Sequence, residues 1–177
     1  MDDTSHSIDE YYDVVIVGAG PAGLGVGILL QKLGIDYVIL EKDFVGSSFR
    51  KWPEETRFIS PSFTGNFFKM PDLNAISPKT SPAFELLTEH PTGNEYADYL
   101  AHVSRYFQLE IATRVEVKNI EDKGDSFILN TSNGTYGSTF VIWAAGEYQY
   151  PKTNAFEGHH LCTHYSEIGS FSAMEAR

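Results

Sequence analysis

Residues 13–23 read DVVIVGAGPAG, an apolar run with β-branched side chains that leads into a glycine-rich turn. Continuous apolar runs of this kind are typical of strands buried on both faces, as in parallel sheets. Residues 21–33 then favour a helix, because apolar side chains recur on one side and Gly34 stands at its stop. Residues 37–40 read as a second buried strand. The order strand, helix, strand predicts a βαβ unit and an α/β fold.

Three glycines lie where the first strand turns into the helix. In a G-x-G-x-x-G pattern, Gly18 allows the tight turn and Gly20 lets the backbone approach a pyrophosphate. Gly23 lets the helix pack closely on the strand. Pro21 and Ala22 begin the helix, whose unpaired N–H groups and positive dipole end attract phosphate. The turn is therefore expected to hold the pyrophosphate of a dinucleotide.

The acidic residue that completes this pattern stands at the end of the second strand. Glu41 follows the glycine turn by about 20 positions, the spacing that places a carboxylate on the ribose of the nucleotide. A carboxylate accepts hydrogen bonds from both ribose hydroxyls and repels a 2′-phosphate. We therefore expect the adenosine of FAD or NAD, not of NADP, with the adjacent Lys42 counted among the cofactor-binding residues.

The segment after Glu41 distinguishes FAD from NAD. An NAD-type dehydrogenase would continue with alternating strands and helices. Residues 42–91 instead contain six of the eight prolines and show little periodicity. Loops of this length usually wrap a ligand or are disordered, and the many aromatic side chains here argue against disorder. The segment favours FAD.

The remaining elements complete a Rossmann-like pattern. Thr92 and Glu95 form a capping box and predict the start of another helix. Three short strand signals follow, with an Asn-Gly turn between the last two, over residues 114–120, 126–131 and 134–139. The expected fold is α/β, a Rossmann-like FAD-binding domain with a parallel sheet and helices, plus a small antiparallel β meander.

Residues 140–143, FVIW, read as a further buried strand, which Ala144, Ala145 and Gly146 follow. This order of segments resembles the FAD domain of flavoproteins with two dinucleotide-binding domains, the superfamily of thioredoxin reductases and flavin-containing monooxygenases. Ala144-Ala145-Gly146 resembles their second signature, usually Ala-Thr-Gly, where the chain returns past the FAD. Pro21 inside the glycine loop resembles the version that these flavoproteins use.

Shorter segments resemble one branch of that superfamily, the bacterial FAD/NAD(P)-dependent oxidoreductases near the monooxygenases. They read FISPS, DLNAIS and WAAGE, at residues 58–62, 72–77 and 143–147. The resemblance implies that FAD is the cofactor. In the whole protein a hydride would pass from NAD(P)H to the flavin, and electrons would pass on to an unknown acceptor.

The resemblance also implies further cofactor contacts. Ser48 and Phe49 lie in a segment that resembles the Gly-Gly-x-Trp stretch passing the FAD. Trp52 and Arg57 match the Tyr-Pro and Arg downstream of it, and Val115 matches the position whose backbone meets the adenine. No catalytic acid, base or nucleophile is expected in the chain, and no metal site.

Two departures from the family limit the activity that is expected. Monooxygenases carry F-x-G-x-x-x-H after the second signature, but here Phe156 and Gly158 are followed by His164, and Cys162 stands where the histidine belongs. This argues against monooxygenation, which is kept as an alternative. Bacillithiol-disulfide-reductase relatives place a cysteine in the glycine loop, where this chain has Ala22, so thiol reduction is not supported.

Length suggests one FAD-binding domain over residues 11–177 after a disordered acidic head, residues 1–10. The NAD(P)H domain and the closing segment of the family are not expected within these 177 residues. We therefore interpret the chain as part of a longer enzyme. Two alternatives remain: a non-catalytic flavin- or nucleotide-binding module, and a fragment of an NAD-binding dehydrogenase.

Charge and composition exclude several classes of partner. The net charge of −11, from 24 acidic and 13 basic side chains, argues against nucleic acid. No apolar run approaches the roughly 18 residues of a membrane span. A single cysteine cannot form an intrachain disulfide or a C-x-x-C pair, so the protein is expected in the reducing cytoplasm.

Overall fold

The computed structural model describes residues 8–63, 72–147 and 150–174. The chain divides into two compact units, which are described separately below. The first unit comprises Met1–Val45 and Ser104–Ala145, and the second comprises Gly46–Val103 and Gly146–Arg177. The expected βαβ unit and the expected meander both lie in the first unit.

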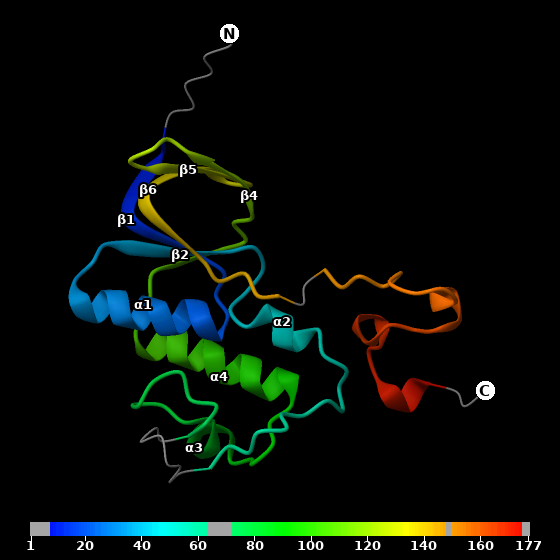
Figure 1. Cartoon of the computed structure of the whole chain (residues 1–177). Helices are drawn as coiled ribbons and strands as arrows, with labels where there is room; N and C mark the ends of the chain where they lie inside the picture. Colours follow the sequence, from blue (N-terminus) through cyan, green and yellow to red (C-terminus); the bar gives the residue numbers. More distant parts are fainter. Residues whose placement is uncertain (1–7, 64–71, 148–149, 175–177) are drawn as a thin grey trace. The chain divides into compact units, whose positions relative to one another are not determined.

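The first unit is built on a six-stranded sheet with the strand order β3-β2-β1-β6-β5-β4. The strands are β1 (Glu10–Val17), β2 (Tyr37–Glu41), β3 (Ile111–Thr113), β4 (Val117–Asp122), β5 (Phe127–Thr131) and β6 (Gly134–Trp143). Strands β3, β2, β1 and β6 are parallel, whereas β4, β5 and β6 form the antiparallel meander. Figure 1 shows helix α1 (Pro21–Leu33) beside this sheet. The α/β fold predicted from the sequence is confirmed.

Helix α1 has the bounds that the sequence predicts. Pro21 occupies its first turn, where a missing N–H costs nothing, and Gly34 ends it in the left-handed conformation with φ 69°. The Gly34 N–H donates to the carbonyl of Gln31 at 3.1 Å. Leu24 is fully buried, and α1 packs on β1 and β2. The helix therefore holds its N-terminus at the carboxyl end of β1.

The last strand differs from its prediction. Residues 140–143 do not form a separate buried strand: they continue the strand that begins at Gly134. Phe140 and Trp143 are each 63% exposed. Strand β5 pairs with β6 only from Gly134 to Ser138, so beyond that point β1 is the sole partner strand among the described residues. With a neighbour on one edge alone, this half of β6 is not enclosed.

The opposite end of the sheet begins earlier than the sequence indicates. Strand β1 starts at Glu10, within the range expected to be a disordered head, and Asp9 accepts a hydrogen bond from the Thr135 N–H at 2.8 Å. Residues 1–7 of that head lie outside the described residues. No helix in the described part of the chain is long and apolar enough to cross a membrane.

The second unit contains little regular structure besides helix α4 (Gly93–Tyr106), whose last residues belong to the first unit. Its short helices are α2 (Ser47–Arg50) and α3 (Pro82–Leu86), and three 3₁₀ turns cover His159–Leu161, Tyr165–Glu167 and Phe171–Ala173. The predicted capping box starts α4: the Glu95 N–H donates to Thr92 Oγ1 at 3.2 Å, and the Thr92 N–H donates to Glu95 Oε2 at 2.7 Å.

Aromatic side chains fill the core of the second unit. Phe49 packs against Trp52, Phe58 and Tyr96 with ring centroids 5.1, 5.8 and 4.9 Å away. Tyr96 lies on α4, and burial raises its pKa. The proline-rich segment is therefore not disordered where it is described, because its aromatic residues pack on α4. Residues 64–71 of that segment lie outside the described residues.

Candidate cofactor site

The first glycine of the turn is required by the fold. Gly18 has φ 108°, which side chains rarely adopt, and a Cβ there would lie 2.5 Å from the Ala144 carbonyl oxygen and 3.0 Å from Ala145 Cα. The Gly18 N–H donates to the Leu40 carbonyl at 2.8 Å. The turn is thus held between the ends of β2 and β6, and Ala144 and Ala145 lie against it.

The third glycine is also required by packing. A Cβ on Gly23 would lie 1.9 Å from the carbonyl oxygen of Gly18, closer than any real contact. One turn further along α1, a Cβ on Gly27 would lie 2.9 Å from Ile39 Cδ1 on β2. These glycines let the helix approach the sheet, which fixes the position of its N-terminus.

The second glycine differs from the other two. Gly20 has φ −84° and ψ −173°, an extended conformation open to any residue. A Cβ built on it would meet no atom within 4 Å. Neither backbone torsion nor protein packing therefore requires glycine here. The open space beside Gly20 is the place where a ligand could approach the backbone.

The start of α1 is suited to an anion. Pro21 lacks an N–H, no side chain caps the helix, and no acidic residue stands in its first turn. The amides of Ala22 and Gly23 have no acceptor among the described residues, as expected for the first turn of a helix. Unpaired amides and the helix dipole together favour a phosphate at this position.

The carboxylate of Glu41 is fixed at the same turn. Its side chain is buried, with 8% of the residue exposed, and Oε2 accepts a hydrogen bond from the Ala19 N–H at 2.8 Å. Oε1 accepts from the Asp43 N–H, also at 2.8 Å. An ionised carboxylate can accept about four hydrogen bonds, so each oxygen keeps an acceptor position. The two amides therefore orient the carboxylate at the glycine turn and leave capacity for ribose hydroxyls.

Two other expected contacts lie near this carboxylate. The Val115 N–H donates to the backbone carbonyl of Glu41 at 2.9 Å, and Val115 itself is 4% exposed. Lys42 follows directly and is partly buried. The structure thus brings together the predicted residues of the first unit around the carboxyl ends of β1 and β2.

A pair of side chains beside this site carries no sequence motif. The guanidinium carbon of Arg114 lies 5.1 Å from the centroid of the Phe44 ring. Arg114 has φ 61°, a left-handed conformation that is unusual for arginine. Neither the contact nor the torsion can be derived from residue types, so sequence reasoning missed the pair.

The remaining predicted residues belong to the second unit, where they have local roles. Phe49 and Trp52 lie in the aromatic core, Ser48 is exposed on α2, and Gly146 has φ 80°. Each of these residues is described here within the second unit alone. Their contact with a cofactor stays a prediction.

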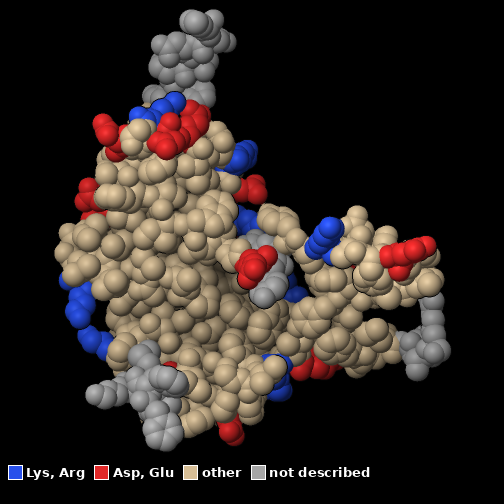
Figure 2. Space-filling view, viewed as in Figure 1, with Lys and Arg blue, Asp and Glu red and all other residues tan. Residues whose placement is uncertain are grey.

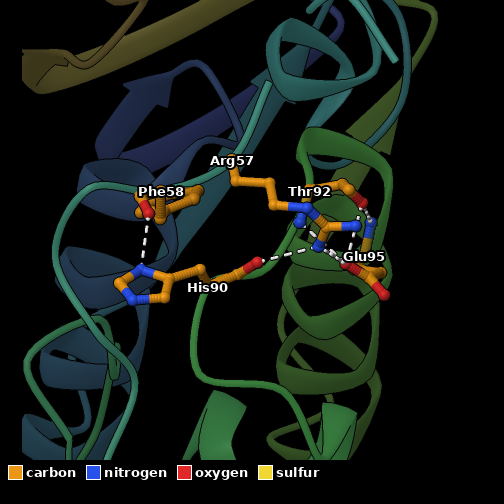
Figure 3. A network of polar contacts seen from close by, with 5 residues as sticks. All are labelled: Arg57, Phe58, His90, Thr92 and Glu95. Atoms are coloured by element: carbon orange, nitrogen blue, oxygen red, sulfur yellow. Dashed lines mark hydrogen bonds and ion pairs between the residues drawn. The ribbon is translucent and has the colours of Figure 1, made fainter. Parts of the chain in front are cut away.

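Arg57 also contributes to the structure of the second unit. Figure 3 shows its guanidinium donating to the His90 carbonyl, at 3.0 Å from Nη1, and approaching the Glu95 carboxylate at 3.7 Å. The His90 ring lies 2.9 Å from the Phe58 carbonyl. Arg57 thereby links the loop before α4 to the capping box, and its side chain is still 54% exposed.

The charged surface and the potential metal ligands are unremarkable. On the face shown in Figure 2, acidic and basic side chains are interspersed among uncharged ones, without a basic patch. No three His, Cys, Asp or Glu side chains of the described residues are grouped so as to hold a metal. Cys162 is exposed.

Comparison with known proteins identifies the family of the chain. Residues 15–177 match the family described as pyridine nucleotide-disulphide oxidoreductase. An uncharacterized CzcO-like oxidoreductase of Geobacillus kaustophilus is 29% identical over 140 residues, 78% of this chain and 37% of the relative. Bacilliredoxin reductase Bdr of Bacillus subtilis is 26% identical over 157 residues, 88% of this chain and 45% of the relative.

The fold has a solved counterpart. The bacillithiol disulfide reductase Bdr from Staphylococcus aureus superposes with a TM-score of 0.72 at 26% identity, covering 86% of this chain and 43% of that chain. This chain therefore matches less than half the length of the relatives named here.

Proposed function

Because the chain belongs to the pyridine nucleotide-disulphide oxidoreductase family, we propose that it is the FAD-binding part of an NAD(P)H-dependent flavoprotein oxidoreductase. The observation that carries this proposal is the second glycine of the turn, which neither torsion nor packing requires. An absent Cβ at Gly20 is explained if a pyrophosphate occupies the space beside it.

Residues of the first unit would hold each part of the dinucleotide. The first-turn amides of α1 would bind the pyrophosphate, and the Glu41 carboxylate would accept hydrogen bonds from the adenosine ribose. Because Glu41 is already held by the Ala19 and Asp43 amides, it needs no rearrangement to do so. When bound, FAD would supply the redox chemistry, accepting a hydride from NAD(P)H and passing electrons onward.

The same carboxylate selects the kind of nucleotide. A 2′-phosphate on the ribose would bring negative charge against a buried carboxylate, and the repulsion would be strong at such a short distance. The first nucleotide is thus the adenosine of FAD or NAD, and the family favours FAD. Ala22 stands where a thiol-reducing relative would need cysteine, so the glycine turn does not support thiol reduction.

Reconstitution with FAD tests the proposal. The purified chain is incubated with FAD, desalted and examined by absorption spectroscopy, beside Gly20→Val and a matched control, Gly169→Val. Gly169 also has open space around its Cβ position, but it lies in the second unit. Wild type and control should retain the flavin bands, and Gly20→Val should bind FAD about 100-fold more weakly, or roughly 2.7 kcal/mol.

Two outcomes would count against the proposal. A wild-type chain that remains colourless after incubation with FAD would exclude the flavin-binding reading. Flavin retention in Gly20→Val equal to that of wild type would show that the pyrophosphate does not bind at the glycine turn. Anaerobic NADPH added to the flavin-loaded chain then shows whether these residues alone can reduce the flavin, because the flavin bands bleach only on reduction.

A further inference from the structure

The order of strands gives a direction to the bound dinucleotide. In a parallel sheet, ligands lie along the carboxyl ends of the strands. Here β1 ends at the glycine turn, β2 ends at Glu41, and β3 is the next strand in the same direction, ending at Thr113. If the pyrophosphate rests at β1 and the ribose at β2, the base of the nucleotide is directed toward the end of β3.

The end of β3 runs beside the end of β2. The Arg114 N–H donates to the Asp43 carbonyl at 3.2 Å, and the Val115 N–H donates to the Glu41 carbonyl at 2.9 Å. Arg114 is therefore the direct neighbour of Val115, whose backbone contacts Glu41, the proposed ribose-binding residue. The Arg114 carbonyl in turn accepts a hydrogen bond from Ser132 Oγ at 3.4 Å. Arg114 is therefore anchored through both its amide and its carbonyl.

The side chain of Arg114 lies over an exposed aromatic ring. Phe44 is 54% exposed, although it is a large apolar residue, and the Arg114 guanidinium lies 5.1 Å from its centroid. Among the described residues no carboxylate pairs with this guanidinium, in a chain with 24 acidic residues. A planar cation without an anionic partner, backed by an aromatic ring, is suited to stacking on a flat, electron-rich base.

The backbone of Arg114 supports the same reading. Its φ of 61° is costly for arginine, and glycine would adopt this conformation without strain. A residue with a strained backbone beside a ligand site is often retained because its side chain has a function there. Arg114 thus has both features: its backbone is left-handed, and its guanidinium contacts the Phe44 ring.

We propose that Phe44 and Arg114 together recognise the base of the bound nucleotide, with adenine stacking on the guanidinium plane that Phe44 supports. This inference rests on the proposed function, because it requires a dinucleotide at the glycine turn and Glu41. The pair sets affinity and base preference, while the turn binds pyrophosphate of any nucleotide.

Titration of FAD against four variants tests the pair. Arg114→Ala and Phe44→Ala should each weaken FAD binding about tenfold, the size of one lost stacking contact. Arg114→Lys keeps the charge but loses the plane, so it should lose most of the same affinity. Lys118→Ala removes an exposed cation of the same unit from β4 and should bind FAD like wild type.

Competition of ADP and of inorganic pyrophosphate with FAD shows which part of the cofactor the pair contacts. Arg114→Lys should weaken ADP about tenfold and leave pyrophosphate unchanged, because only ADP carries a base. Full FAD affinity in Arg114→Lys would show that charge alone matters and would overturn stacking. Equal weakening of ADP and pyrophosphate would also overturn it.

Arg114→Gly separates recognition from folding. Glycine relieves the left-handed backbone, so this variant should unfold thermally at the wild-type temperature or higher while losing FAD affinity. Wild-type FAD affinity in Arg114→Gly and Arg114→Ala would overturn the pair and leave the proposed function standing. If wild type itself binds no FAD, it is the proposed function that fails.

Discussion

Two stretches of the same sheet have almost the same apolar pattern and opposite environments. Val14–Val17 on β1 pair in register with Phe140–Trp143 on β6. In β1 the four residues are between 0% and 7% exposed, whereas Phe140 and Trp143 are each 63% exposed. The difference shows that the burial of a strand is determined by the elements packed around it and not by its own apolar pattern.

The neighbours differ in a simple way. Strand β1 lies between β2 and β6, and helix α1 packs on it, so both edges and one face are covered. The second half of β6 has β1 on one edge, and its pairing with β5 ends at Ser138. Exposed strand edges with apolar side chains favour further pairing, so this half of β6 is prone to association.

Matched truncations in the two strands should give the largest contrast. Ile16→Ala removes fully buried atoms from β1 and should lower the free energy of unfolding by about 2–5 kcal/mol. Phe140→Ala, at an exposed position of β6, should change it by no more than about 0.5 kcal/mol. Urea denaturation measures both. A similar loss in the two variants would mean that the end of β6 is buried in solution.

Within the glycine turn, the same comparison can be made at closer range. Gly23→Ala places a Cβ against the Gly18 carbonyl and should cost about 1–3 kcal/mol of unfolding free energy. Gly20→Ala meets no atom within 4 Å and should cost less than about 0.5 kcal/mol. Thermal unfolding without ligand measures both. A large loss in Gly20→Ala would give that glycine a structural role and weaken the case for a ligand.

The smallest effect is expected at the exposed end of the second unit. Hydrogen bonds from the Ser170 hydroxyl, and then from the Phe171 and Ser172 amides, lower the pKa of Glu55 from 4.5 to about 2. A lowered pKa means that the stabilisation is present above pH 4.5 and is lost as the pH falls toward about 2. Amide NMR signals of residues 170–172 should shift over that interval, and Glu55→Gln should abolish the transition. A midpoint near 4.5 would contradict the three contacts.

The sequence predicted the parts of the fold that local chemistry determines. Helix α1 begins at Pro21 and stops before Gly34 as expected, and the Thr92–Glu95 capping box starts α4. These signals act within a few residues. Strand β3 was missed because three residues, Ile111–Thr113, are too few to show a period. The exposure of β6 was missed because it depends on where β5 stops pairing.

The residues of the candidate site can be divided in the same way, into those that local sequence predicts and those that depend on tertiary contacts. The glycine spacing and Glu41 were found because a motif fixes their positions relative to β1 and β2. The hold of the Ala19 and Asp43 amides on Glu41 was not foreseen, and it changes how that residue should be tested. Replacing Glu41 would remove a ribose acceptor and would also leave the buried Ala19 amide and the partly buried Asp43 amide unpaired, so Gly20 is the cleaner position to alter.

The most direct test of the central claim is an amide NMR titration of the chain with FAD. If the pyrophosphate rests on the start of α1, the largest shifts should fall on the amides of Gly20, Ala22 and Gly23, whose N–H groups it would meet. Smaller shifts should reach Ala19 and Asp43 through Glu41. The account would be contradicted if saturating FAD left these amide signals unshifted, or shifted only the signals of residues elsewhere.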